Sequence, residues 1–171
     1  MNKDMMPQKK ATVWIVFCAV AVVLIILDLL LKHWAEANLM GQPSRVLING
    51  ILGLTYHENP GVAFGLLSDF GWGRWVITVI NIFLMLGLLW YYHQMSSGKK
   101  FWFVRVPLIL IFAGGVGNLI DRIALGIVRD MLEFLFVRFA IFNLADVYVT
   151  VGAFSFLFFA LFVVKDIPYI K

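Results

Sequence analysis

Four acidic residues in the second half of the chain could carry reaction chemistry. They are Asp121, Asp130, Glu133 and Asp146. Two carboxylates held close together in a site of low dielectric cannot both ionise cheaply, so such a pair shares one proton. One carboxylate can then activate a water molecule while the other donates a proton to a developing oxyanion. The residues alone do not decide which two of the four acids form such a pair.

Other catalytic groups have weaker support in the sequence. The few serines lack a nearby base motif, and His33, His57 and His93 lie in three separate segments, so a serine–histidine arrangement is not indicated. Ligation of a metal ion by the carboxylates stays open as an alternative. We expect neither a metal nor a cofactor, because a carboxylate pair can hydrolyse a bond without one.

The composition is that of a membrane protein. Of the 171 residues, 62% are hydrophobic and 14% are charged, and the mean hydropathy is +0.91. At this length we expect one membrane-embedded domain over residues 1–171, with any site between the spans or in a loop beside them. The net charge of +4 is small and scattered, so nucleic acid is not indicated as a partner.

Four apolar stretches are long enough to cross a bilayer as helices, which takes about 20 residues each. They are residues 13–31, 75–92, 104–120 and 147–164. Basic residues gather near the two termini and around the connection between the second and third stretches: Lys3, Lys9, Lys10, Lys99, Lys100, Arg105, Lys165 and Lys171. The positive-inside rule therefore predicts two cytoplasmic termini and two longer connections that face outward.

A cleaved signal peptide is the alternative for the first stretch, because Ala35-Glu36-Ala37 resembles a small-x-small cleavage site. The apolar run is longer than is usual for a signal peptide, and Asp28 interrupts its end. An uncleaved spanning helix fits better.

The first outward connection carries signals for a small β-sheet element. Residues 45–48 and 51–56 are two short β-prone runs that flank Asn49-Gly50, which predicts a hairpin. Residues 59–65 combine an Asn-Pro turn signal with glycines that permit close backbone approach. The predicted fold is thus an α-helical integral membrane protein with four transmembrane helices and a small extracytoplasmic sheet element.

Polar residues gather at the predicted outer ends of the spans. They are Asp28, Lys32, Asn59, Asn118, Asp121, Arg122, Asn143 and Asp146. Ionisable groups at membrane depth are expensive, so their convergence at one level indicates a site. Asp28 and Lys32 are four residues apart, which favours an interfacial salt bridge with a lysine that reaches toward the surface. Gly114, Gly115 and Gly117 are expected to allow close helix packing.

A carrier that uses the same acids as proton or cation sites is a second class of function. It would need matching polar groups in the middle of each span or on the inner side, and beyond Thr78 and Asn81 of the second span the inner halves offer few. A structural assembly subunit would leave the shared face of the acids unexplained.

Four local patterns occur in an order that resembles one known family. They are Asp28-x-x-x-Lys32, Asn59-Pro60-Gly61-Val62-Ala63-Phe64-Gly65, Gly117-Asn118-Leu119-Ile120-Asp121-Arg122 followed by Gly126-Ile127-Val128-Arg129-Asp130, and Phe142-Asn143-Leu144-Ala145-Asp146. Together they resemble the bacterial lipoprotein signal peptidases, or signal peptidase II, over nearly the whole chain. Each pattern is weak alone, but four in order with this topology are specific.

The resemblance implies roles for these residues. It implies a catalytic pair of Asp130 and Asp146, residues that shape the site or bind substrate at Asn59, Gly61, Asn118, Arg122 and Asn143, and supporting residues at Asp28, Lys32 and Asp121. It also implies an aspartic endopeptidase of the bacterial inner membrane that acts near the extracytoplasmic face. Its substrates would be prolipoproteins, cut on the N-terminal side of a diacylglyceryl-modified cysteine, its surroundings membrane lipids, and its inhibitors cyclic peptides of the globomycin type.

The sequence departs from the family pattern at two positions. Leu29 stands where glutamine is common, and Arg129 stands where an apolar residue is usual. We expect Arg129 to point toward lipid headgroups, and its replacement by valine to change activity modestly.

Overall fold

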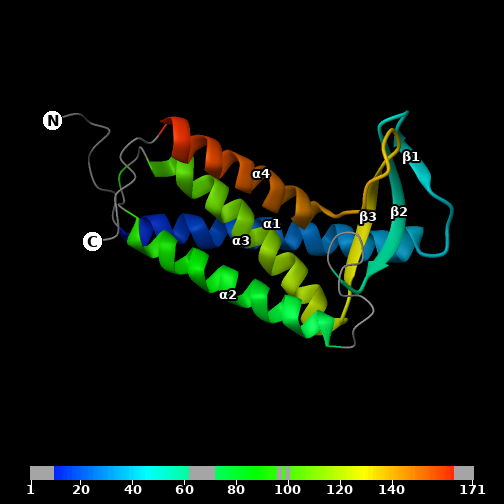
Figure 1. Cartoon of the computed structure of the whole chain (residues 1–171), viewed down its shortest axis with the longest axis horizontal. Helices are drawn as coiled ribbons and strands as arrows, with labels where there is room; N and C mark the ends of the chain where they lie inside the picture. Colours follow the sequence, from blue (N-terminus) through cyan, green and yellow to red (C-terminus); the bar gives the residue numbers. More distant parts are fainter. Residues whose placement is uncertain (1–9, 62–71, 96–97, 99–100, 164–171) are drawn as a thin grey trace.

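The computed structural model describes residues 10–61, 72–95, 98 and 101–163, and within them the chain forms a helical bundle with an antiparallel sheet across one end (Figure 1). The helices are α1 (Lys10–Leu39), α2 (Gly73–Gln94), α3 (Trp102–Ala124) and α4 (Leu144–Phe158), which the short π-helix η4 (Phe159–Val163) continues. The strands are β1 (Arg45–Ile48), β2 (Leu52–Asn59) and β3 (Val128–Phe134).

The four predicted spans are confirmed. In the described part of the chain, α1, α2, α3 and α4 with η4 are each long and apolar enough to cross a membrane. Each begins before its predicted bound, and α1, with 30 residues, is about 45 Å long at 1.5 Å per residue. That exceeds a hydrocarbon core of about 30 Å, so α1 is long enough to reach past the membrane into the sheet. The last predicted span residue, Val164, lies outside the described residues, as do Lys3, Lys9, Lys99, Lys100, Lys165 and Lys171.

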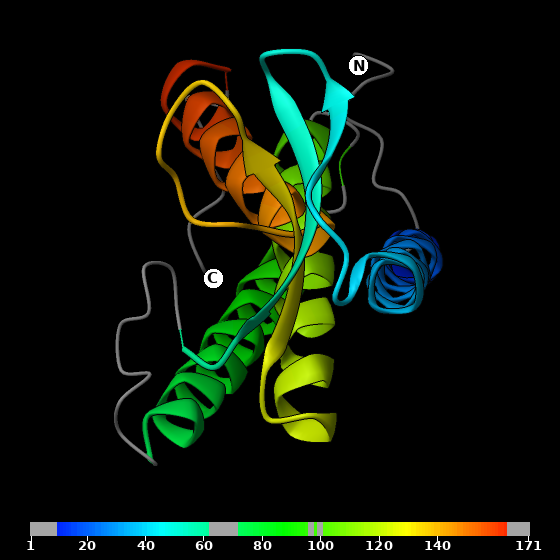
Figure 2. The same ribbon diagram turned by 90° about the vertical axis from the view of Figure 1, so that its right-hand side faces the viewer.

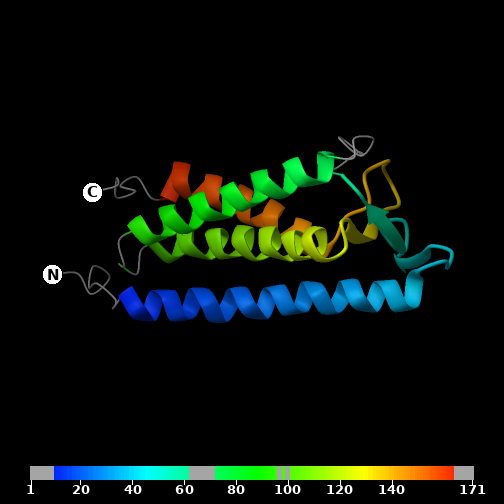
Figure 3. The same cartoon turned by 90° about the horizontal axis from the view of Figure 1, so that it is seen from below.

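The helices alternate in direction. The start of α1 and the end of η4 lie at the end of the bundle opposite the sheet, whereas α2 and α4 start at the sheet end (Figures 1 and 3). Helix α3 packs along α4 and also contacts α1 and α2. The sheet end is therefore where the polar ends of the spans meet.

Close packing of α3 depends on its glycines, as the sequence predicts. A Cβ atom at Gly114 would clash with the backbone oxygen of Ala145, and one at Gly117 would lie 2.5 Å from Oδ2 of Asp28. A Cβ at Gly115 would meet the side chain of Met85. These glycines thus let α1, α2 and α4 approach α3 where the site forms.

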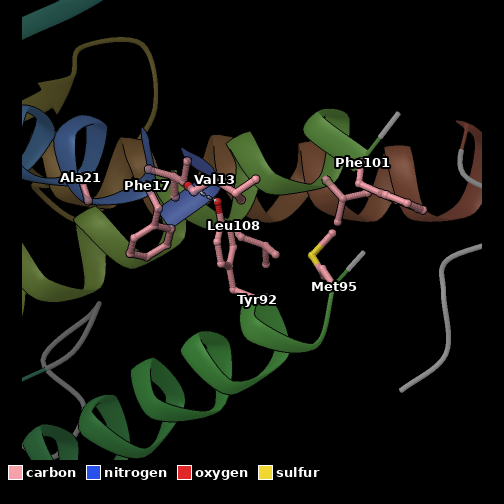
Figure 4. Close-up of a cluster of buried hydrophobic side chains, with 9 residues drawn as sticks. Val13, Phe17, Ala21, Tyr92, Met95, Phe101 and Leu108 are labelled. Atoms are coloured by element: carbon pink, nitrogen blue, oxygen red, sulfur yellow. Dashed lines mark hydrogen bonds between the residues drawn. The ribbon is translucent and has the colours of Figure 1, made fainter. Parts of the chain in front are cut away.

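An apolar cluster fills the bundle at the end opposite the sheet (Figure 4). Phe17 and Tyr92 pack with ring centroids 4.6 Å apart, and the Tyr92 hydroxyl donates to the Val13 carbonyl. Arg105 is buried inside α3 near this cluster and donates to the carbonyl of Gly98. Its charge therefore lies at the end of the bundle far from the sheet.

The hairpin predicted around Asn49-Gly50 is present, and it gains a third strand. Gly50 has a φ of 68°, the left-handed conformation that the turn between β1 and β2 requires. Strand β3, which the sequence analysis did not predict, pairs antiparallel with β2 and places Asp130 opposite His57. Figure 2, which views the sheet end, shows the strands lying across the helices.

The last turns of α1 anchor this sheet. Ala35, Leu39 and Met131 form a buried apolar cluster between α1 and β3. The residues that resemble a signal-peptide cleavage site, Ala35 to Ala37, thus lie inside a continuous helix with Ala35 fully buried. This packing favours an uncleaved helix.

Candidate active site

Strand β3 carries Asp130 into the interior at the sheet end of the bundle. Its side chain is 1% exposed and accepts hydrogen bonds from the Nδ2 atoms of Asn59 (3.1 Å, to Oδ2) and Asn143 (2.7 Å, to Oδ1). Asn59 ends β2, so the pairing of β2 with β3 is what brings this amide to the carboxylate.

Asp146 lies in the first turn of α4. It forms a capping box with Asn143: the Asn143 side chain accepts from the Asp146 backbone N–H, and the Asp146 carboxylate accepts from the Asn143 backbone N–H. The positive end of the helix dipole favours a negative charge at this position. The cap therefore fixes the Asp146 side chain.

Two buried amides connect the two carboxylates. Asn118 of α3 donates from Nδ2 to Asp146 at 2.8 Å, and Asn143 donates from Nδ2 to Asn118 at 3.0 Å and to Asp130 at 2.7 Å. The path Asp130–Asn143–Asn118–Asp146 therefore joins β3, the start of α4 and the end of α3. Of the four candidate acids, this path brings together Asp130 and Asp146.

The surroundings of Asp130 change its acidity. Burial, and after it the negative charge of Asp146, raises the pKa of Asp130 from its ordinary value of 3.8 to about 7, against the opposing effect of the hydrogen bonds from Asn59 and Asn143. At neutral pH a large share of Asp130 thus keeps its proton. The arrangement offers a proton donor beside a second carboxylate.

Both carboxylates open on one cavity of about 540 Å³. Its polar wall is formed by Asn59, Asn118, Arg122, Asp130 and Asp146, and its apolar wall by side chains such as Phe134, Phe139, Phe142, Val147 and Val151. The cavity thus combines a few convergent polar groups with a broad apolar lining, as ligand sites commonly do.

Arg122 and Gly61 shape one edge of this cavity. The guanidinium of Arg122 donates to the carbonyls of Gly61 and Asn118, both at 3.4 Å, and the Gly61 backbone N–H donates to Oδ1 of Asn59 at 3.0 Å. The turn after β2 is therefore held against the end of α3. Residues 62–65, the rest of the predicted Asn-Pro-Gly motif, lie outside the described residues.

The residues predicted as supporting lie directly beneath the amides. Lys32 is fully buried, with its Nζ 2.8 Å from Asp28, 3.4 Å from Asp121 and 2.9 Å from Oδ1 of Asn118. The predicted salt bridge between Asp28 and Lys32 is confirmed, but the expectation that Lys32 reaches toward the surface is wrong. The carboxylate of Asp121 and the amide of Asn118, both from α3, hold the ammonium inside.

The other two candidate acids face away from the pair. Asp121 accepts hydrogen bonds from Arg129, and Glu133 accepts one from the hydroxyl of Ser44 near the outer part of the sheet. Arg129 itself is 11% exposed at its side chain and contacts two carboxylates, so the expectation that it faces headgroups is wrong. Its second partner is Glu36, one turn after Lys32 on α1.

The polar residues Thr78 and Asn81 lie in the first half of α2, nearer the sheet, and serve helix packing. Thr78 donates to the Arg74 carbonyl, and Asn81 donates to the Gly115 carbonyl of α3. They offer no support for the carrier alternative.

Sequence reasoning missed the phenylalanines of the cavity and the role of Glu36. Phe134 ends β3 and Phe142 precedes the cap, and their rings pack with centroids 4.9 Å apart. The spacing of Lys32 and Glu36, four residues apart on α1, was a signal that could have indicated Glu36 as part of the polar cluster.

The fold and site together define a multi-pass membrane protein with two linked carboxylates, Asp130 buried and Asp146 partly buried, at one end of its helical bundle. The family model described as signal peptidase II matches residues 20–162. The chain belongs to the signal peptidase II family, and it is a membrane peptidase.

Relatives and solved structures agree with this membership. The chain is 43% identical over 129 residues to the lipoprotein signal peptidase of Streptococcus thermophilus (strain CNRZ 1066), covering 75% of this chain and 81% of the relative. It is 42% identical over 131 residues to that of Streptococcus pyogenes serotype M5 (strain Manfredo), covering 77% and 83%.

Among solved structures, a bacterial membrane enzyme determined by the in meso method at 2.3 Å is similar, with a TM-score of 0.75, 28% identity and 95% and 93% of the two chains covered. A second, determined at 1.9 Å, has a TM-score of 0.77 at 24% identity over 95% and 99% of the chains, which supports the fold alone.

Proposed function

We propose that this chain is an aspartic endopeptidase that removes the signal peptide from diacylglyceryl-modified bacterial prolipoproteins. Cleavage falls on the N-terminal side of the lipidated cysteine. The observation that carries the proposal is the linkage of Asp130 and Asp146 through Asn143 and Asn118, with both carboxylates on one cavity. The names of the streptococcal relatives support the substrate class.

The two carboxylates take different roles in the proposed mechanism. Asp130, with its pKa of about 7, keeps a proton and acts as the general acid. Asp146, at the N-terminal end of α4, is the general base. Asn143 orients both side chains by its hydrogen bonds.

The reaction needs only water and the peptide. Asp146 removes a proton from water, whose oxygen attacks the scissile carbonyl carbon while Asp130 donates its proton to the carbonyl oxygen. The tetrahedral intermediate collapses, the C–N bond breaks, and the leaving nitrogen takes a proton from the pair. The products are a signal peptide with a new carboxylate and a lipoprotein with a free amine on its modified cysteine, without a covalent intermediate.

The apolar lining of the cavity suits this substrate. Phe134, Phe139 and Val151 offer a surface for the hydrophobic signal peptide or the acyl chains, beside the polar wall that holds the peptide bond. A globomycin-type cyclic peptide would inhibit by occupying the same space. Prolipoproteins and membrane lipids are thus the proposed partners.

The proposed location is the bacterial cytoplasmic membrane, with both termini in the cytoplasm and the site near the extracytoplasmic face. The support is the position of the sheet, opposite the start of α1 and the end of η4, together with the basic residues near both termini. A peptide bond cut near the membrane surface needs no deep water channel, which suits carboxylates at the outer ends of helices.

The purified protein in detergent is expected to cleave a synthetic prolipoprotein peptide only when its cysteine carries the diacylglyceryl group. Mass spectrometry should identify a product that begins at that cysteine, and EDTA should leave the rate unchanged because the carboxylate pair supplies both proton transfers. Equal cleavage of the unmodified peptide would contradict the substrate class. Loss of activity in EDTA, restored by one metal ion, would contradict the mechanism.

Activity is expected to fall in alkaline solution. Because Asp130 must be protonated and its pKa is raised to about 7, kcat/KM should decrease above that pH. The decrease approaches tenfold per pH unit, so activity at pH 9 should be about a hundredfold below its maximum. The control is recovery of activity after return to pH 7. A profile that stays level from pH 6 to pH 9 would contradict the role of Asp130 as the acid.

A further inference from the structure

Strand alternation turns Arg129 away from its neighbour Asp130. Asp130 faces Asn59 and Asn143, whereas Arg129 faces α1 and the end of α3, because successive side chains of a strand point to opposite sides. Arg129 does not line the cavity. Its contacts are thus with the protein scaffold.

Arg129 is bound to both helices at once. Its Nη2 lies 2.7 Å from Oδ1 of Asp121 and its backbone N–H donates to Oδ2 of Asp121 at 3.1 Å, while its Nη1 lies 2.8 Å from Oε2 of Glu36. Its carbonyl accepts a hydrogen bond from the Nδ2 of Asn143, the same amide that donates to Asp130. A planar guanidinium presents its N–H donors as a rigid fork, which suits contacts to two carboxylates on different sides.

We infer that Arg129 is a positioning residue that ties β3 to α1 and α3 and thereby fixes Asp130 relative to Asp146, an inference that rests on the proposed function. Apart from Arg129, β3 is joined by backbone hydrogen bonds to β2 on one side and to Phe142 on the other, and Met131 packs on α1 through apolar contacts. The ion pairs of Arg129 are therefore what anchors this strand by charge to the spanning helices. Asp130 is the next residue along the strand, so a shift of the anchor moves the carboxylate.

The ion pair between Arg129 and Asp121 also affects the position of Lys32, because Lys32 contacts the same carboxylate. Asp121 is 1% exposed and shares its charge between Arg129 and Lys32. Without Arg129, Lys32 would be the cation of the described residues left in ion-pair contact with Asp121, and it would be drawn toward that carboxylate. That movement would weaken the hydrogen bond from Lys32 to Asn118, the amide that donates to Asp146.

Arg129→Met keeps the apolar stem of the side chain and removes both ion pairs. We expect kcat to fall about 10- to 100-fold with KM within about threefold of wild type, since small displacements of a catalytic group have effects of this size. Arg129→Lys should recover part of the loss, because one cation remains beside Asp121. This replaces the modest effect expected from sequence alone.

The matched control is Arg45→Met, the same change at an exposed arginine of β1 that contacts the Asn38 carbonyl. It should leave kcat unchanged. Thermal unfolding and gel filtration of each variant report whether it is folded. The charge-balanced variant Arg129→Met/Asp121→Asn removes one cation and one anion together and separates loss of the anchor from an unpaired buried charge.

The kcat and KM values of these variants decide whether Arg129 positions Asp130. A low kcat with wild-type KM in the Arg129→Met variant and in the charge-balanced variant supports the inference. Wild-type kcat in either variant, or a loss confined to KM, would overturn it. If Arg129→Met does not fold, the charge-balanced variant decides by the same criterion. Wild type and Asp130→Asn are assayed in parallel: failure of wild type to cleave, or cleavage by Asp130→Asn, would refute the proposed function instead.

Discussion

Asp130→Asn is expected to lower kcat at least about a thousandfold while the protein stays folded. The substitution removes the proton donor, and general acid–base groups contribute effects of this order. Asparagine nearly matches the shape of the protonated side chain, and it removes the charge repulsion with Asp146 that helps to raise the pKa of Asp130. The NH2 group of the new amide faces the Nδ2 donor of either Asn59 or Asn143 and cannot accept its hydrogen bond. The loss of that hydrogen bond costs about 1 kcal/mol.

The measurement is cleavage of the diacylated peptide, with thermal unfolding of the same preparation. Glu133→Gln is the matched control, because it removes a carboxylate from the same strand whose side chain faces Ser44. It should keep kcat within about threefold of wild type, since surface substitutions away from a site have small effects. Full activity in the Asp130→Asn variant, or loss in Glu133→Gln instead, would move the chemistry to another acid.

Lys32→Met is expected to produce the largest loss of stability. The ammonium is fully buried between Asp28 and Asp121, and its removal leaves two buried carboxylates without their shared cation. Breaking a buried ion pair from one side costs about 3–5 kcal/mol. The yield of folded protein in detergent and its unfolding temperature should therefore fall sharply.

Lys10→Met is the control for this substitution, because Lys10 is exposed at the start of the same helix. Lys32→Met/Asp28→Asn should recover part of the yield, since one of the two carboxylates is neutralised and asparagine can still accept from the Ala145 backbone N–H. A Lys32→Met protein with wild-type stability would show that the buried charges do not hold the helix ends together.

Local patterns in the sequence predict the parts of the fold that depend on neighbouring residues. Hydropathy finds the four spans, because about 20 apolar residues leave few alternatives to a spanning helix. Asn49-Gly50 marks the hairpin, because the turn requires a left-handed residue, which Gly50 provides.

The third strand was missed because its evidence is not local. Strand β3 pairs with β2, which lies about 70 residues earlier in the chain, as in the pairing of Asn59 with Val128. Without the strand, nothing in the sequence distinguishes Asp130 from Asp121 or Glu133 as a catalytic acid, because all three lie in or beside the connection between the third and fourth spans. The pairing is what sends Asp130 toward Asp146 and Glu133 toward Ser44.

The wrong expectations for Lys32 and Arg129 have the same origin. A long cation at a helix end or beside a membrane usually reaches for water or headgroups. Here the partners are supplied by distant segments: Asn118 is 86 residues from Lys32, and Glu36 is 93 residues from Arg129. Spacing along one helix shows Asp28 beside Lys32. It does not show the groups from other segments that contact the two cations, which are Asn118 and Asp121 for Lys32 and Asp121 and Glu36 for Arg129.

The central claim is that Asp130 and Asp146 act as one catalytic unit. The most direct test compares kcat for wild type, Asp130→Asn, Asp146→Asn and the double variant, each shown to be folded, on the same diacylated peptide. Groups that act as a unit have non-additive effects, so we expect both single variants to lose at least about a thousandfold and the double variant to be no worse than either. Activity retained by either single variant, or losses that multiply in the double variant, would contradict the claim.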